Sequence, residues 1–235
     1  MEIPKSQIIE AKIKDWLKQG NAKIAWDTAT MKEIMAASRQ LAKKYGELIG
    51  ETFNMDSILD DLPELQKTLQ NLRSRAADST RAEVAIQNEN SEINIKAQAA
   101  SKKSESISNL IERIRQGTYA NDGSIADSDK FLIDKSVLKH IATEGCVDTL
   151  EENAALAADA GIETMYIRHL GPGGCCPWCQ RLAGSYTYWT LPDDFWRTHD
   201  NCDCWIEYKT EKVHHKITYT NRDANGKKRK ITSRM

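Results

Sequence analysis

The opening of the chain lacks a long run of apolar side chains. In MEIPKSQIIEAKIKDWLKQG, lysines and acids recur every few residues. This pattern excludes both a signal peptide and a membrane-spanning helix in that segment. We therefore expect the protein to remain in the cytoplasm where it is made. A reducing compartment keeps thiols free, so clustered cysteines there are more often metal ligands than disulfides.

The sequence also lacks the motifs of two groups of zinc hydrolases. None of its five histidines is followed two positions later by the glutamate that a zinc deaminase needs, and no H-E-x-x-H metallopeptidase motif is present. A metal-dependent nuclease would need a histidine with carboxylates beside the metal. Only His199 with Asp200 offers this arrangement. A zinc-dependent enzyme acting on nucleic acid therefore stays open as the alternative function.

Positive and negative charges nearly cancel over the whole chain, but they are unevenly distributed along the sequence. The formal net charge is −1 at pH 7, yet residues 212–235 carry eight Lys or Arg against the single acid Asp223, which gives this segment about +7. The residues before it hold the compensating excess of acids, about −8. The C-terminal segment is thus a basic appendage to an acidic body.

The first half of the sequence has the apolar period of amphipathic helices. One apolar stripe lies in residues 9–17, a second in 31–48, and a short heptad-like seam with Pro63 in its first turn in 62–72. Residues 76–106 are rich in Ala, Ser, Asn and Glu and predict at best a weakly packed helix held by neighbours. Residues 107–114 restore an amphipathic helix that Gly117 ends.

The second half predicts one long helix followed by short strands. Ser136 is the expected N-cap, and Gly161 ends the helix. The apolar period then changes to two in IETMYIRHL, GSYTYW, DCWIEY and HHKITYT, which indicates strands. The predicted fold class is α+β, with an extended N-terminal helical arm followed by a small zinc-stapled β-rich C-terminal head. The predicted domains are a docking or oligomerisation arm (1–128), the head (129–211) and a basic β-hairpin tail (212–235).

Five side chains of the predicted head have the spacing of a metal site. Cys176 and Cys179 form a C-x-x-C knuckle, and the later stretch THDNCDC contains His199, Cys202 and Cys204. A structural zinc ion takes four such ligands at the corners of a tetrahedron. We expect Cys176, Cys179 and Cys202 first, with Cys204 and His199 competing for the fourth place. Cys202 and Cys204 stand two residues apart, so on an extended chain both face the same side.

Two other interpretations of the thiols are less favoured. Two disulfides across the same loops would contribute roughly 2 to 4 kcal/mol each, but the cytoplasmic origin disfavours them. A thioredoxin-like redox pair places its C-x-x-C at the start of a helix, and it would leave HDNCDC unexplained. Cys146 is expected to be buried as a small apolar residue, and Cys175 to point away from the metal.

A structural zinc ion is the favoured interpretation of the cluster. A β-rich head of roughly 75 residues with such short strands buries little core alone, and metal binding supplies on the order of 10 kcal/mol to small units. We expect Gly171, Gly173 and Gly174 to adopt the positive φ values of a knuckle. We also expect five aromatic side chains to pack around the metal: Trp178, Trp189, Phe195, Trp196 and Trp205.

Several short motifs occur together in residues 136–208. A T-E-G element on the long helix leads through a strand to C-x-x-C-x-x-L-A-G and then to R-x-H-x-x-C-x-C. The residues concerned are Thr143, Glu144, Gly145, Cys176, Cys179, Leu182, Gly184, Arg197, His199, Cys202 and Cys204. In order and spacing, this segment resembles the Mu F-like family of phage minor head proteins, also described as head morphogenesis proteins. The residues before it carry no such resemblance.

The resemblance implies a non-enzymatic minor capsid protein of a phage. Such a protein associates with the portal or with the major capsid protein on the inner side of the head during assembly, in several copies per head. It would be found in the host cytoplasm during assembly and in the virion afterwards, at the capsid interior or the portal vertex. No membrane partner is implied.

The C-terminal stretch HHKITYTNRDANGKKRKITS predicts a β-hairpin around the Asn-Gly pair at 225–226. Its second strand is basic, and Lys227, Lys228, Arg229 and Lys230 are candidates for contacts with packaged DNA or with an acidic partner protein. The alternative is a solvated edge strand whose lysines guard against aggregation. No aromatic interleaving and no recognition helix indicate sequence-specific reading of DNA.

Overall fold

The structure is a computed structural model that describes residues 3–20, 29–118, 133–171, 176–199, 202–210, 217–222 and 228–233. Its helices are α1 (Lys5–Lys18), α2 (Met31–Thr52), α3 (Leu62–Asn90), α4 (Glu105–Arg115), α5 (Lys135–Asp159) and α6 (Pro177–Leu182). Its strands are β1 (Met165–His169), β2 (Gly184–Thr187), β3 (Trp205–Lys209), β4 (Ile217–Arg222) and β5 (Lys228–Ser233). A short 3-10 helix, η2 (Tyr188–Thr190), follows β2.

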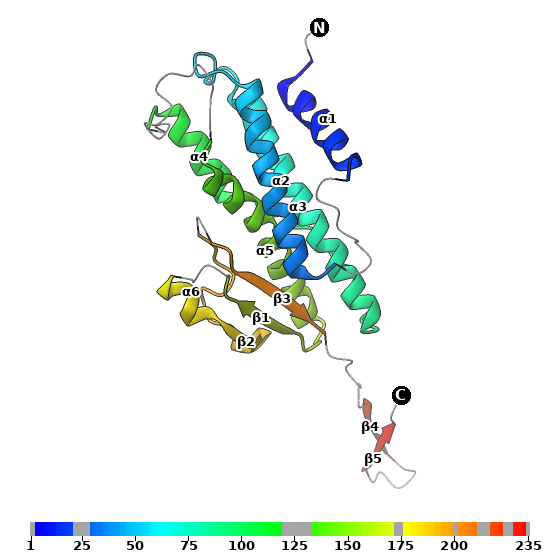
Figure 1. The fold of residues 1–235 in the computed structure, drawn as a ribbon. Coiled ribbons are helices and arrows are strands. Elements are labelled where there is room, and N and C mark those ends of the chain that lie inside the picture. The colour runs from blue at the N-terminus through cyan, green and yellow to red at the C-terminus, as the bar shows by residue number, and fades with distance from the viewer. Residues whose placement is uncertain are drawn as a thin grey trace.

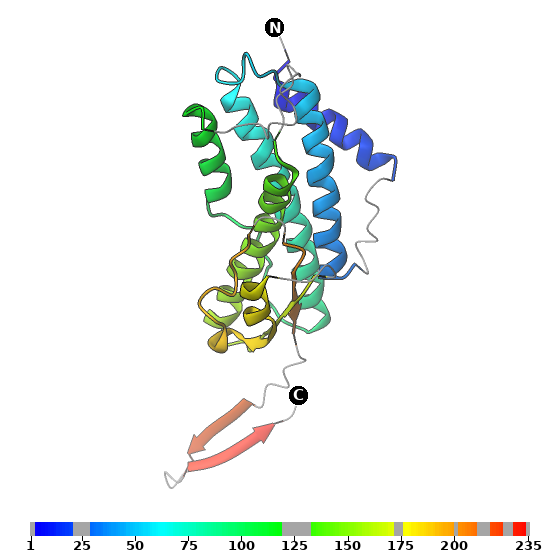
Figure 2. The ribbon, with the colours of Figure 1, turned by 60° about the vertical axis from the view of Figure 1, so that its left-hand side comes forward.

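Three long helices, α2, α3 and α5, pack along one another and form the centre of a bundle (Figures 1 and 2). Helix α1 packs on α2 and α3, and α4 packs on α3 and α5. The apolar stripes predicted from the sequence line the interior, where Ile9, Tyr45 and Leu69 are fully buried. None of the described helices combines the length and the apolar character that crossing a bilayer requires. The predicted helical N-terminal part is confirmed.

Helix α3 extends further, and packs more closely, than its composition predicts. It continues through residues 76–90, where Ala76 and Val84 are buried. The close contact with α5 begins just before this segment, where a Cβ atom on Gly145 of α5 would stand 2.5 Å from the carbonyl oxygen of Arg73. Within the segment, the Cys146 thiol lies 3.7 Å from the carbonyl oxygen of Ala76. The expectation of a weakly packed helix is therefore wrong over these residues, because low hydrophobicity here accompanies a close helix contact.

Helix α5 begins and ends close to the predicted residues. Its N-cap is Asp134, whose carboxylate accepts a hydrogen bond from the Ser136 amide at 2.7 Å. Ser136, the predicted cap, lies instead in the first turn. At the other end Gly161 has a φ of 71°, as a glycine that terminates a helix commonly does.

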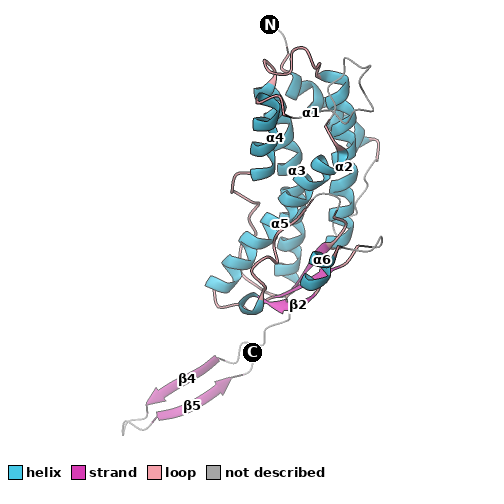
Figure 3. Ribbon diagram, turned by 90° about the vertical axis from the view of Figure 1, so that its left-hand side faces the viewer, coloured by secondary structure: helices cyan, strands magenta, loops and turns pink. Residues whose placement is uncertain are grey.

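The three-stranded sheet has the order β2-β1-β3, and both pairings are antiparallel. In the central strand, Tyr166 lies opposite Tyr186 of β2 and Tyr208 of β3. Strand β3 packs on α2 and α3, so the sheet lies at one end of the bundle (Figure 3). Tyr166, Phe195 and Ile206 belong to the same apolar cluster as the helices. One core thus runs through both parts; the predicted boundary at residue 128 lies outside the described residues.

The two-stranded sheet is the predicted C-terminal hairpin. Strands β4 and β5 pair antiparallel, from Ile217 opposite Ser233 to Arg222 opposite Lys228. The turn expected at the Asn-Gly pair falls within residues 223–227, which lie outside the described part of the chain. The strand pairing itself agrees with the alternation in the sequence.

A buried ion pair joins α3 to α5. The Arg73 guanidinium donates to the Asp148 carboxylate at 2.6 Å, and each side chain is only 10 % exposed. The Lys102 ammonium lies 2.9 Å from the other oxygen of Asp148. Removal of one partner of a buried pair leaves an uncompensated charge in the core. The buried ion pair therefore helps to fix the close contact between α3 and α5, together with the small residues at that contact.

We expect Asp148→Asn to lower the free energy of unfolding by about 3 to 5 kcal/mol, because Arg73 would stay buried without its counter-charge. Asp15→Asn is the matched control, since Asp15 pairs with Lys18 on the exposed face of α1, and it should cost less than about 1 kcal/mol. Urea denaturation gives both values. Equal losses from the two substitutions would contradict a structural role for the buried pair. The double substitution Arg73→Met with Asp148→Leu should recover most of the loss.

Glu83 of α3 is buried, and no cation pairs with it in the described part of the chain. The residue is 6 % exposed, and its carboxylate accepts a hydrogen bond from the Gln87 amide at 2.9 Å. Burial raises the pKa of Glu83 above its ordinary value. Glu64, near the start of the same helix, accepts hydrogen bonds from the hydroxyl and the amide of Ser6. These bonds lower the pKa of Glu64.

The raised pKa predicts that ionised Glu83 weakens the fold. Because the pKa is higher in the folded than in the unfolded state, the penalty is absent below the unfolded pKa of about 4.3 and develops as the pH rises. Glu83→Gln should therefore increase the free energy of unfolding at neutral pH, with a gain that disappears in acid. Glu64→Gln should have the opposite sign at neutral pH. Urea denaturation across this pH range checks both, and a pH-independent effect of Glu83→Gln would refute the assignment.

Candidate metal centre

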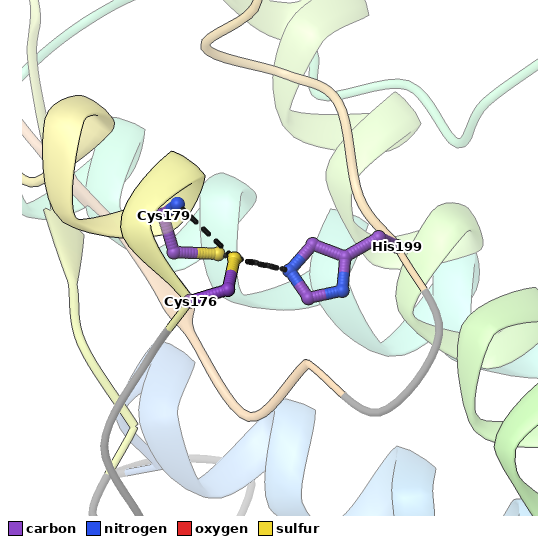
Figure 4. A group of neighbouring side chains, drawn as sticks. All are labelled: Cys176, Cys179 and His199. Carbon is purple, nitrogen blue, oxygen red and sulfur yellow. Dashed lines mark hydrogen bonds between the residues drawn. The ribbon is translucent and has the colours of Figure 1, made fainter.

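The C-x-x-C knuckle stands at the start of helix α6. Cys176 is the N-cap and Pro177 is the first helical residue, a position that favours proline. The backbone amide of Cys179 donates to the Cys176 sulfur at 3.4 Å. This local hydrogen bond helps to hold the two sulfurs near each other, next to the ring of His199 (Figure 4).

The second ligand-bearing segment leads into strand β3. His199 Nε2 lies 3.4 Å from Cys176 Sγ and 3.1 Å from Cys179 Sγ. The Cys202 amide donates to the His199 carbonyl oxygen at 3.3 Å, which turns the chain back toward the knuckle. As a result, Cys202 Sγ lies 3.6 Å from Cys179 Sγ.

The five candidate ligands gather around Cys179. Its sulfur belongs to two groups whose ligand atoms all lie within 4.8 Å of one another: Cys176, Cys179 and His199, and Cys179, Cys202 and Cys204. Around a tetrahedral zinc-sized ion, neighbouring sulfur and nitrogen ligands stand about 3.5 to 3.8 Å apart. The distances at Cys179 are close to these values, and the described cysteines are free thiols. The cluster can therefore hold a metal ion.

The candidate cysteine ligands differ in burial and in the pKa of their thiols. Cys179, Cys202 and Cys204 are buried, whereas Cys176 is exposed. Desolvation, followed by the contact with Cys202, raises the pKa of Cys179 to about 12. The hydrogen bond from the Cys179 amide lowers the pKa of Cys176. A metal ion must therefore displace a tightly held proton from Cys179, so binding should release protons.

Two of the five aromatic side chains expected around the metal lie at the cluster. Trp178 packs on the cysteines and lies edge-on to His199, with ring centroids 5.5 Å apart. Trp205 lines the small cavity beside Cys202 and Cys204. The expectation is wrong for the other three: Phe195 and Trp196 belong to the core shared with the helices, and Trp189 is 77 % exposed.

Gly171 serves the loop before the knuckle by allowing a close approach. Its φ is not positive, contrary to expectation. A Cβ atom there would stand 2.7 Å from the Cβ of Asp203. Gly171 thus lies directly on the residue between Cys202 and Cys204. The other residues expected in this loop lie outside the described part of the chain: Gly173, Gly174 and Cys175.

The remaining candidate residues lie apart from the cluster. Cys146 is fully buried on α5, as predicted, and burial raises its pKa. Glu144 accepts a hydrogen bond at 2.7 Å from the hydroxyl of Ser104, which is the N-cap of α4. In the basic tail, strand β5 contains three of the four candidates, Lys228, Arg229 and Lys230, and Lys227 lies outside the described residues.

Arg168 of β1 is a site residue that the sequence patterns missed. It is 3 % exposed. Its guanidinium donates to the carbonyl oxygens of Phe195 and Arg197 and lies over the ring of Trp178, 5.2 Å from the ring centroid. Arg168 therefore links β1 to both ligand-bearing segments. The sequence did offer one signal for it. Buried and less buried residues alternate along β1, and Arg168 lies on the same buried face as Tyr166.

Within the described part of the chain, a small cavity adjoins the buried half of the cluster. The cavity beside Cys202 and Cys204, which Thr143 and Arg168 also line, has a volume of about 10 Å³. Such a volume holds one water molecule at most. Two larger hollows, of about 410 and 440 Å³, contain no candidate ligand. A substrate could reach the cluster from the side of Cys176, where it is exposed.

Comparisons of the chain with models of protein families, with curated proteins and with solved structures found no match.

Proposed function

We propose that the protein is a non-enzymatic minor capsid protein of a phage head, with a structural zinc ion at the cysteine cluster. The observation that carries the proposal is the convergence of five ligand side chains from two separate segments on the sulfur of Cys179. A metal ion there cross-links the knuckle at α6 to the segment that leads into β3. Its task in this proposal is mechanical.

The donor set favours zinc over other metals. Thiolate and imidazole ligands in a tetrahedral arrangement suit Zn²⁺, whereas Mg²⁺ and Ca²⁺ prefer oxygen ligands. The segments to be held are short, since the strands that flank the cluster, β2 and β3, have four and five residues. A metal cross-link supplies free energy that such short strands provide only in small part.

A structural role is favoured over a catalytic one because of the ligand number and the space. A catalytic zinc site keeps one position open for water or substrate. Here two groups of three ligands share Cys179 and offer five candidate ligands between them, one more than a closed site needs. The adjoining cavity beside Cys202 and Cys204 measures about 10 Å³. The alternative function, a zinc-dependent enzyme acting on nucleic acid, would have to use the exposed edge at Cys176 and His199.

The role in head assembly rests on the resemblance of residues 136–208 to the Mu F-like minor head proteins. In this proposal the helical bundle docks to the portal or to the major capsid protein, and several copies enter each head. The basic tail, with about +7 in residues 212–235, contacts packaged DNA or an acidic surface of the capsid. The protein then resides in the virion.

The proposed site predicts about one zinc ion per chain in the purified protein, measured by elemental mass spectrometry. Cys176→Ser should reduce the zinc content and lower the thermal stability of the C-terminal part, because it removes a ligand. Cys146→Ser is the matched control, since Cys146 is a buried thiol outside the cluster. Equal zinc content and equal stability in the two variants would rule out the metal cross-link.

The proposed role predicts that the chain and its zinc are found together in intact phage particles, measured by proteomics and elemental analysis of purified virions. Incubation of the purified protein with single- and double-stranded DNA and RNA should leave the nucleic acids intact. Cleavage that a chelator abolishes, and that His199→Ala removes, would instead establish the enzyme alternative. Absence of the chain from particles would refute the structural role.

A further inference from the structure

Arg168 carries a buried positive charge without a carboxylate partner in the described part of the chain. Its polar contacts are two backbone carbonyl groups, those of Phe195 and Arg197, the latter at 3.1 Å from each terminal nitrogen. Its Nε atom is buried and has no hydrogen-bond partner among the described residues. A buried charge costs several kcal/mol unless another charge compensates it. Neutral carbonyl groups satisfy hydrogen bonds, but they carry no net counter-charge.

The neighbouring cations near the cluster are compensated. The Arg39 guanidinium donates to the Cys204 carbonyl oxygen at 2.8 Å and lies 3.8 Å from the Asp203 carboxylate. The ammonium of Lys139 lies 3.2 Å from the same carboxylate. Arg168 differs from both, since it is 3 % exposed and has no carboxylate beside it among the described residues. It lines the small cavity that Cys202 and Cys204 also line.

A zinc–thiolate centre is an anion, which supplies the missing charge. Zn²⁺ with three thiolates and a neutral imidazole has one net negative charge, and with four thiolates it has two. We propose that Arg168 is the buried counter-charge and positioning residue of a metal centre that holds at least three thiolates. The inference rests on the proposed zinc site and extends it to a residue that is not a ligand.

The contacts of Arg168 also place the ligands. Its bonds to the carbonyl groups of Phe195 and Arg197 hold the chain directly before His199. Its guanidinium lies over the ring of Trp178. Trp178 stands between Cys176 and Cys179 in the sequence, so this contact holds the knuckle. Both ligand-bearing segments are therefore fixed to β1 through one guanidinium. Residues that orient metal ligands in this way commonly change metal affinity by 10- to 100-fold when replaced.

The test compares the zinc affinity of the full chain and of three variants, by competition with a chromophoric chelator at fixed pH. Arg168→Met keeps a long side chain without charge, and its affinity should fall on the order of 10- to 100-fold. Arg168→Lys keeps the charge and should retain most of the affinity. Arg115→Met is the matched control, because the Arg115 side chain is 61 % exposed and pairs with Glu112 on α4, away from the cluster; its affinity should be unchanged.

Cobalt substitution adds a readout of the centre itself. Co²⁺ bound to three or more thiolates has strong sulfur-to-metal charge-transfer absorption, which should persist in Arg168→Lys and be weakened in Arg168→Met at equal Co²⁺ concentration. Circular dichroism of the metal-free variants shows whether each one folds. If Arg168→Met does not fold, the zinc affinity of Arg168→Lys tests the inference. A role based on charge predicts an affinity near that of the parent chain, and a large loss in Arg168→Lys would contradict it.

The possible outcomes distinguish this inference from the proposed function. Zinc binding by the parent chain with unchanged affinity in Arg168→Met would overturn the inference alone. Equal losses in Arg168→Met and Arg168→Lys would also overturn it, since the guanidinium would then act through shape and not through charge. Absence of zinc from the parent chain would overturn the proposed zinc site itself.

Discussion

The meeting of two chain segments at the Cys179 sulfur is the contact on which the C-terminal part depends. The sulfur of Cys179 is fully buried and lies within 3.6 Å of both His199 Nε2 and Cys202 Sγ. Protonated thiols bind one another weakly, and the raised pKa of Cys179 keeps it protonated without a metal. An ion at this position turns weak contacts into bonds, which is why we assign the cluster a mechanical task.

The helices restrain the other side of the same sheet. Tyr166 and Tyr208 project from β1 and β3 into the apolar cluster that α2, α3 and α5 share. The sheet is thus held on one face by burial in the helical core and at one end by the cysteine cluster. This division explains why large rings such as Phe195 and Trp196 lie in the core, whereas Trp178 lies at the cluster. A force on the helical bundle would be transmitted to the sheet through this shared core.

Periodicity and spacing predicted much of this arrangement, and the failures have physical causes. The helices that bury large aliphatic side chains, and the strands that alternate, were predictable because their signals are local. The close packing of residues 76–90 was not, since small side chains signal weak burial unless a partner helix is known to approach. The convergence at Cys179 followed from the C-x-x-C and H-x-x-C-x-C spacings. Arg168 was missed, because an arginine at a buried strand position has no meaning until its surroundings are known.

Two buried arginines illustrate how this fold handles charge in its interior. Arg73 meets Asp148 directly, with both side chains 10 % exposed, and that pair depends on nothing outside the protein. Arg168 has carbonyl oxygens and the Trp178 ring around it, and no carboxylate pairs with it among the described residues. The first arrangement compensates its charge within the helical bundle. In our proposal the second is compensated by a metal–thiolate centre, because an ion that removes the thiol protons also creates the negative charge that Arg168 requires.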